Sequence, residues 1–190
     1  MQKIRIGNIE IVKPRQIVYD ILKYKDSGKV LDLGAGFGRH SLFLAYKGFQ
    51  VTAVEKEEDK LIKLQENSET LGVKISTVHS DVTDFESKGK YNVVIATMVL
   101  HFLSEKEAKK MIGKIQNWTT SGGLNVVSVY TDQNVENLRH YLFNVNELKD
   151  LYANWEILQY QESLGSPVEN PKDGAPPRRY AARMIARKLN

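Results

Sequence analysis

The stretch VLDLGAGFGRH at residues 30–40 constrains the fold more than any other part of the chain. A short apolar run ends there in three glycines, each two residues from the next. Glycines this dense are typical of backbone that adopts positive φ or approaches a ligand closely. We therefore predict a strand at 29–33, a tight ligand-facing turn, and a helix at about 38–47 that ends at Gly48.

The same alternation of strand and helix continues along the chain. Apolar runs predict strands at 50–55, 73–80, 91–97 and 124–130, and helical spacing predicts helices at about 58–70 and 104–118. The last helix has the clearest pattern. Ser104 and Glu107 form a capping-box pattern, and one face is apolar at Ala108, Met111, Ile112 and Ile115. A turn at Ser121-Gly122-Gly123 is expected before the fifth strand.

The ends of the chain follow other patterns. Two alternating triplets around Gly7-Asn8 predict a hairpin, and a first helix is expected between Pro14 and Ser27. After the fifth strand the sequence predicts, in order, an aromatic-containing candidate lid at 131–145, a helix at about 145–152, a strand around 155–161, a Gly/Pro-rich loop at 165–177 and a last strand at about 180–188.

Strands that alternate with helices across short turns predict an α/β fold with a parallel sheet and helices on both faces. At 190 residues the chain is long enough for one buried core, so we expect a single domain over 1–190. Within it, residues 1–27 form a hairpin and helix, 28–130 a ligand-binding core, and 131–190 a lid and C-terminal strands. Ligands of such sheets lie beyond the carboxyl ends of the strands.

Composition excludes several classes of protein. No apolar run approaches the roughly 20 residues of a membrane span, and the N-terminus has no secretory-signal pattern. The chain contains 0 cysteines, which excludes disulfides and thiolate metal sites and favours a cytoplasmic location. The four histidines lack metal-ligand spacing, so no metal is predicted.

The net charge of +4 is concentrated at the C-terminus, where residues 172–190 carry six Lys or Arg and one acid. Such a segment suits a small anion, an acidic surface or nucleic acid, and it equally suits a solvated final strand.

The glycine turn has the spacing D-x-G-x-G-x-G from Asp32 to Gly38. A dinucleotide fingerprint would need G-x-G-x-x-G, with its third glycine at position 39, but that position is occupied by Arg39. Glu55 ends the second strand 21 residues after Gly34, where a carboxylate can accept hydrogen bonds from ribose hydroxyls. Nicotinamide and adenosyl cofactors both contain ribose, so Glu55 leaves both open.

Three features resemble the class I S-adenosylmethionine-dependent methyltransferases: the acid inside the first strand, the short glycine spacing, and Asp81 followed by Val82 and Thr83 after the third strand. The resemblance covers about residues 28–130. It implies a Rossmann-like, mostly parallel seven-stranded sheet with an antiparallel C-terminal strand, and S-adenosyl-L-methionine as cofactor. The cofactor-binding residues that it implies are Asp32, Gly34, Ala35, Gly36, Gly38, Arg39, Glu55, Lys56, Asp81, Val82, Thr97 and Met98.

Longer segments resemble the tellurite-resistance (TehB-like) methyltransferase family. They are VLDLGAGFGRHSLFLAYKGFQVTAVEK, TMVLHFL, ELKDLYANWEILQYQE and the closing MIARK. The resemblance implies methylation of oxyanions of tellurium or selenium, with the anion held by His and Arg of the last segment. No histidine follows residue 140, so the positional candidates are Arg178, Arg179 and Arg183, while His101 is a candidate general base. We take Arg179, Arg183 and His101 as the candidate catalytic residues.

Methyl transfer from a sulfonium requires chiefly alignment, and an anionic or soft nucleophile needs no base. The residues after the fourth strand, Ala96-Thr97-Met98-Val99, lack the Asn/Asp-Pro-Pro-aromatic motif of nucleobase amine methylases. We therefore expect methylation of a small anionic or soft nucleophile, either an oxyanion of the tellurite or selenite type or a thiol, with no membrane or nucleic-acid partner and the oligomeric state open. The alternatives are methylation of RNA or another macromolecule through the basic C-terminus, a non-catalytic S-adenosylmethionine-binding protein, and a nicotinamide oxidoreductase.

Overall fold

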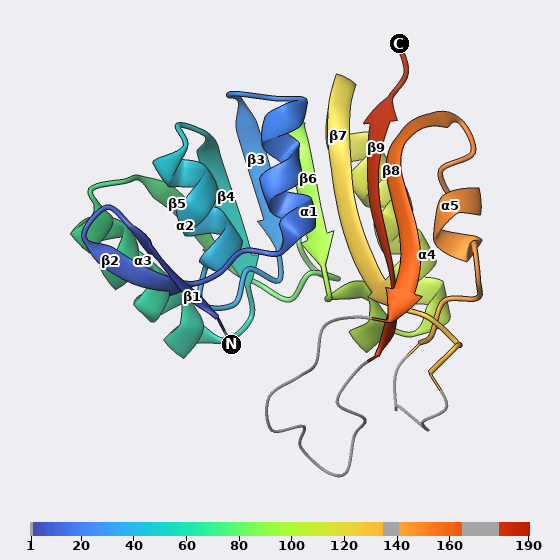
Figure 1. Cartoon of the computed structure of the whole chain (residues 1–190), viewed down its shortest axis with the longest axis horizontal. Helices are drawn as coiled ribbons and strands as arrows, with labels where there is room; N and C mark the ends of the chain where they lie inside the picture. Colours follow the sequence, from blue (N-terminus) through green and yellow to red (C-terminus); the bar gives the residue numbers. More distant parts are fainter. Residues whose placement is uncertain (1, 135–140, 165–178) are drawn as a thin grey trace.

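A seven-stranded sheet forms the centre of the computed structural model, which describes residues 2–134, 141–164 and 179–190 (Figure 1). The strand order is β5-β4-β3-β6-β7-β9-β8. Every strand runs parallel to its neighbours except β9, which is antiparallel to both β7 and β8. The strands are β3 (Lys29–Leu33), β4 (Gln50–Glu55), β5 (Ile75–His79), β6 (Tyr91–Thr97), β7 (Thr119–Tyr130), β8 (Trp155–Leu164) and β9 (Tyr180–Lys188).

Helices cover both faces of this sheet. One face carries α1 (Gln16–Tyr19) with its 3-10 continuation η1 (Asp20–Lys23), α2 (Arg39–Tyr46) and α3 (Glu58–Leu71). The other carries α4 (Glu105–Trp118) and the short α5 (Glu147–Asp150), and η2 (Leu100–Phe102) precedes α4. A separate hairpin of β1 (Lys3–Ile6) and β2 (Ile9–Val12) packs beside α3. The expected Rossmann-like fold is confirmed.

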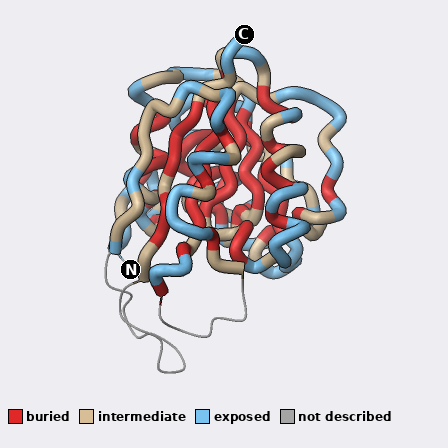
Figure 2. Tube along the Cα trace, turned by 90° about the vertical axis from the view of Figure 1, so that its right-hand side faces the viewer, coloured by how far each residue is buried: buried red, intermediate tan, exposed pale blue. Residues whose placement is uncertain are grey.

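The alternation of side chains along β3 divides the core into two layers. Val30 points to the face of α1 and α2, whereas Leu31 and Leu33 pack against α4. Asp32 shares the face of Val30, and this places its carboxylate beside the start of α2. Figure 2 shows the buried residues gathered in the strands, with exposed residues on the surrounding helices and turns.

The capping box that the sequence predicts for α4 is present. The hydroxyl of Ser104 accepts a hydrogen bond from the Glu107 amide, and the Glu107 carboxylate accepts one from the Ser104 amide. The two side chains thus satisfy amides that a helix start otherwise leaves unpaired.

The prediction of a turn at Ser121-Gly122-Gly123 before the fifth strand is wrong. Strand β7 begins at Thr119, directly after α4, and includes the Ser121-Gly122-Gly123 segment. The pairing with β6 shifts register there, and Gly122 has φ of 66°. The two glycines let the backbone form an irregular, bulged section, so the chain stays in the sheet instead of reversing.

The candidate lid is anchored at both of its described ends. Phe143 is fully buried, and its amide donates to the carbonyl of Tyr130 while its carbonyl accepts from Asp132. Residues 135–140 of this segment, the Gly/Pro-rich loop at 165–177 and Arg178 lie outside the described residues. Among the residues that the structure describes, no helix is long and apolar enough to cross a membrane.

Candidate functional site

The site lies at the carboxyl ends of β3, β4 and β6. The strand order reverses at β3. On one side of β3 the next strands in the sheet are β4 and then β5, and on its other side they are β6 and then β7. The loops after β3 and β6 therefore leave on opposite faces, and the crevice between them is where open α/β sheets bind ligands.

The glycine turn after β3 presents backbone to this crevice. Gly34, Gly36 and Gly38 all have positive φ, of 68°, 57° and 79°. A Cβ on Gly34 would lie 2.7 Å from Val99, and one on Gly38 would lie 2.6 Å from Leu64. At Gly36 a Cβ would meet no described atom within 4 Å. The outer glycines are thus required by packing, and the middle one faces open space.

Glu55 fixes the shape of this turn. Its Oε2 accepts the Gly36 amide at 2.8 Å, and its Oε1 accepts the amides of Lys56 and Glu57 at 2.9 and 3.1 Å. The side chain is only 6% exposed. A carboxylate has about four acceptor positions, so one position on Oε2 remains for a further donor.

Asp32 lies behind the turn and connects it to α2. Its Oδ2 accepts the Ser41 hydroxyl at 2.6 Å, and the group is fully buried. Burial raises the pKa of Asp32 to about 6, although the Ser41 hydrogen bond and the charge of Arg39 oppose this shift.

Asp81 lies beyond the end of β5. Its Oδ1 accepts the amide and hydroxyl of Thr83 at 3.0 and 2.9 Å, and these bonds contribute most to its lowered pKa. Its Oδ2 is 3.5 Å from the Lys56 ammonium, and the next residue, Val82, is buried. The structure thus brings Lys56 and Asp81 together.

The end of β6 carries both a buried polar contact and backbone strain. The Thr97 hydroxyl lies 3.2 Å from Nδ1 of His40, which is buried on α2. Desolvation lowers the pKa of His40 well below its usual value, so the ring is neutral. Met98 follows with φ of 58°, a left-handed conformation that is rare outside glycine and often marks a functional site.

Two of the three candidate catalytic residues meet at Tyr130. The guanidinium of Arg179 lies 5.2 Å from the centre of the Tyr130 ring, and the His101 ring lies 4.3 Å from it. Arg183 projects from β9, where burial lowers its pKa, and its Nη1 donates to the Ser163 hydroxyl at 3.2 Å and the Ala181 carbonyl at 3.1 Å. Arg178 lies outside the described residues.

Sequence patterns did not single out Tyr130 or His40. Tyr130 looks like the last residue of a buried strand, and His40 looks like one of four scattered histidines. Their contacts join residues far apart in the chain, and no local spacing encodes them. Arg15 precedes a short helix whose periodicity does not indicate which part of the site it faces.

Two other features of the described residues bear on the site. An open hollow of about 670 Å³ lies at the amino ends of the strands, lined by residues such as Lys29, Gly48, Lys74 and Lys90. It is at the opposite edge from the glycine turn and contains none of the expected site residues. The residues that the structure describes contain no cluster suited to a metal ion.

Comparison with known proteins identifies the family. A sequence model described as "Tellurite resistance protein TehB" matches residues 8–179. The chain belongs to this family. A probable S-adenosyl-L-methionine-dependent methyltransferase TehB of Haemophilus influenzae is 33% identical over 174 residues, 90% of this chain and 61% of the relative. The chain thus spans about three fifths of the length of this curated TehB relative.

Solved structures agree with the fold. The crystal structure of TehB from Haemophilus influenzae has a TM-score of 0.85 at 31% identity, covering 92% of this chain and 62% of that one. The N-methyltransferase NodS from Bradyrhizobium japonicum, solved with S-adenosyl-L-homocysteine, has a TM-score of 0.75 at 14% identity, covering 92% and 85%. The second likeness concerns the fold alone.

Substitution of the glycines should separate packing from ligand contact. Gly36→Ala should lower the free energy of unfolding by about 1–2 kcal/mol, the cost of left-handed backbone at a non-glycine residue. Gly38→Ala should lower it by about 1–3 kcal/mol more, because its methyl group collides with Leu64. Urea unfolding of both variants measures the difference. Equal losses would mean that the two glycines have the same surroundings.

The raised pKa of Asp32 should appear as a pH-dependent stability. The pKa of Asp32 is about 6 in the folded chain and 3.8 ordinarily. Its contribution to the free energy of unfolding is therefore present below pH 4 and is lost as pH rises through 6. The loss should be roughly 3 kcal/mol. Asp32→Asn should remove this pH dependence. Between pH 4.5 and 7 the free energy of unfolding of the unaltered chain should therefore fall relative to that of the variant. A difference independent of pH would contradict a raised pKa.

Proposed function

We propose that the chain is an S-adenosyl-L-methionine-dependent methyltransferase acting on a small anionic nucleophile. The observation that carries this proposal is the open face of Gly36, held by Glu55 at the point where the strand order reverses. Membership of the TehB family supports it, as does the name of the Haemophilus influenzae relative.

The residues of the crevice fit this cofactor. The bare backbone at Gly36 suits the amino-acid part, and the remaining acceptor position of Glu55 Oε2 suits one ribose hydroxyl. Oδ2 of Asp81 and the buried Val82 suit the edge and face of an adenine. When bound, the cofactor supplies a methyl group on positively charged sulfur, which a lone pair of the acceptor takes while the sulfur keeps the electrons of its broken bond.

The acceptor side of the crevice carries positive charge. Arg179 lies against the Tyr130 ring, Arg183 is in register with Ser128, and the neutral His40 lies against Thr97 at the end of β6. Guanidinium groups orient oxygen-bearing anions through paired donors, and an anionic acceptor already carries its nucleophilic lone pair. Deprotonation by His101 would then be needed only for a neutral acceptor.

Contacts of the C-terminal strand favour a small substrate over RNA. Arg187 pairs with Glu156 at 3.0 Å, and the Lys188 ammonium donates to the carbonyls of Gln116 and Thr119. These basic residues of β9 stabilise the fold, which leaves fewer charges for a phosphate backbone.

Calorimetry and methyl transfer together test the proposal. The chain should bind S-adenosylhomocysteine and not NAD, and it should transfer label from the methyl-labelled donor to an acceptor in a panel of selenite, tellurite, small thiols and RNA. Gly36→Ala should fold and lose both activities, since its methyl group occupies the cofactor side of the turn. Binding of NAD alone would exclude the proposal, and S-adenosylhomocysteine binding without label transfer would indicate a binding protein.

A further inference from the structure

A row of polar side chains crosses the sheet where the apolar core ends. Thr97 of β6 is in register with Ser128 of β7, which is in register with Arg183 of β9. The next positions on the same face, two residues toward the middle of each strand, are Ile95 of β6, Val126 of β7 and Ile185 of β9. These three side chains pack in the core below α1 and α2. The row therefore lies on the α1 and α2 face, at the carboxyl ends of β6 and β7.

Two buried polar atoms at this place lack a hydrogen-bond partner among the described residues. They are Oγ of Ser128, on a side chain that is 1% exposed, and Nε of Arg15. Buried polar groups in folded proteins almost always have a partner, so each unpaired one needs an explanation. A bound ligand would give both atoms a hydrogen-bond partner. The proposed methyltransferase function puts such a ligand, the methyl acceptor, at the end of β6.

Backbone contacts hold Arg15 against the row. Its amide lies 3.5 Å from Nε2 of His40, and Nδ1 of His40 lies 3.2 Å from the Thr97 hydroxyl. Because the ring is neutral, one tautomer satisfies both contacts: Nε2 accepts from Arg15 and Nδ1 donates to Thr97. Arg15 is thereby attached, through His40, to the strand next to Ser128.

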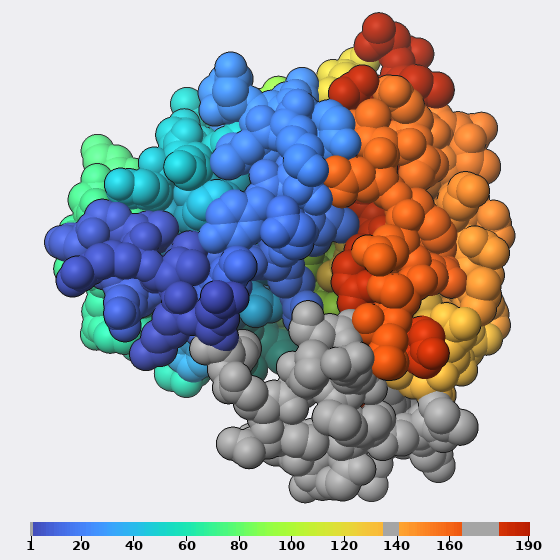
Figure 3. Space-filling model, in the orientation of Figure 1, coloured from blue at the N-terminus to red at the C-terminus, as the bar shows by residue number. Residues whose placement is uncertain are grey.

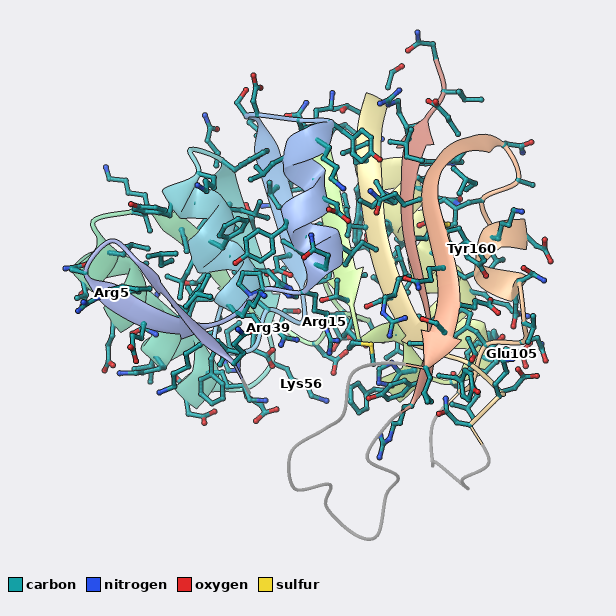
Figure 4. The ribbon with its side chains drawn as sticks, in the orientation of Figure 1. Arg5, Arg15, Arg39, Lys56, Glu105 and Tyr160 are labelled. Carbon is teal, nitrogen blue, oxygen red and sulfur yellow. The ribbon has the colours of Figure 1, made fainter. Side chains whose placement is uncertain are left out.

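The charged groups that act on Arg15 are two further guanidiniums, whereas the buried carboxylate of Asp32 acts on Arg39. Burial and the neighbouring guanidiniums of Arg39 and Arg183 lower the pKa of Arg15 to about 10. In the part of the chain that the structure describes, no carboxylate lies within ion-pair distance of these three residues. Figure 4 shows Arg15 and Arg39 close together at the carboxyl-end edge of the sheet, with Arg5 far away on the hairpin. Three guanidiniums with no described carboxylate within ion-pair distance favour an anionic ligand.

The outer surface is open beside this place. In the space-filling view a recess separates the N-terminal residues, in blue, from the C-terminal strands in orange and red (Figure 3). Arg15 belongs to the N-terminal segment and Arg183 to β9, and the charge of Arg183 acts on the pKa of Arg15, so residues from both ends of the chain come near each other here.

We propose that Arg15 and Ser128, together with Arg183, bind the oxygen atoms of the anionic methyl acceptor. This inference rests on the proposed methyltransferase function and adds two residues that no motif or comparison assigns. Every group of the set donates hydrogen bonds, and a guanidinium fork matches two oxygens of one ligand. The site thus favours an oxyanion over a thiol, and it disfavours an amine that is protonated.

The test measures binding of selenite to the full chain saturated with S-adenosylhomocysteine. Arg15→Gln should weaken selenite binding about ten- to hundredfold, the usual effect of losing a charge-assisted hydrogen bond. Arg15→Lys should weaken it less, because the charge remains and the fork is lost. Ser128→Ala should weaken it about two- to tenfold. Arg5→Gln, on the distant hairpin, is the matched control and should change nothing.

Two further readouts exclude a structural role and a cofactor role. Ser128→Ala should leave the midpoint of thermal unfolding unchanged or raised, because it removes an unpaired buried hydroxyl. Arg15→Gln should leave the affinities for S-adenosylhomocysteine and for 5′-methylthioadenosine unchanged. A weaker affinity for the first alone would assign Arg15 to the cofactor carboxylate and would overturn the inference.

The outcomes also separate this inference from the proposed function. Failure of the unaltered chain to bind S-adenosylhomocysteine would refute the proposed function itself. Cofactor binding without selenite binding, or selenite binding that Arg15→Gln and Ser128→Ala leave unchanged, would refute only the assignment of these residues to the acceptor.

Discussion

The carboxylate of Glu55 determines the shape of the site. It accepts three backbone amides, from the glycine turn and from the segment that leads into α3. Hydrogen bonds to a charged acceptor contribute about 1.5–3 kcal/mol each, so this one side chain joins the ends of β3 and β4 firmly. The consequence is a turn whose outer glycines pack against protein while Gly36 stays uncovered.

Charged groups of both signs surround the crevice. Acids gather on the β3, β4 and β5 side at Asp32, Glu55 and Asp81, where a cationic sulfonium compound with a ribose and a purine fits. Three guanidiniums lie close to one another, Arg15 before α1, Arg39 at the start of α2 and Arg183 on β9, and the proposed anionic acceptor fits there. In the proposed function this arrangement holds donor and acceptor next to each other, and alignment is the main contribution that methyl transfer requires from a protein.

The sequence was sufficient to predict the elements whose signals are local. The glycine spacing, the capping box of α4 and the alternation of strand and helix each depend on neighbours within one or two turns of chain. The prediction failed at Ser121-Gly122-Gly123, because glycines in a bulge and glycines in a turn look alike until the pairing with β6 is known. Local pattern cannot separate the two.

The residues of the proposed acceptor site could not be predicted for a related reason. Ser128 reads as an ordinary residue of a buried strand, and its neighbours in space are set by the register of β6, β7 and β9. The amide of Arg15 lies against His40, 25 positions away in the chain. Such contacts depend on the whole topology, whereas Glu55 and Asp81 could be proposed because each ends a predicted strand.

A crystal structure of the chain with S-adenosylhomocysteine tests the central claim most directly. The expected result is the amino-acid part of the ligand against the open face of Gly36, a ribose hydroxyl on Oε2 of Glu55, and the three amide bonds of Glu55 intact. A ligand bound elsewhere with the turn bare, or a Glu55 side chain released from the turn on binding, would contradict it.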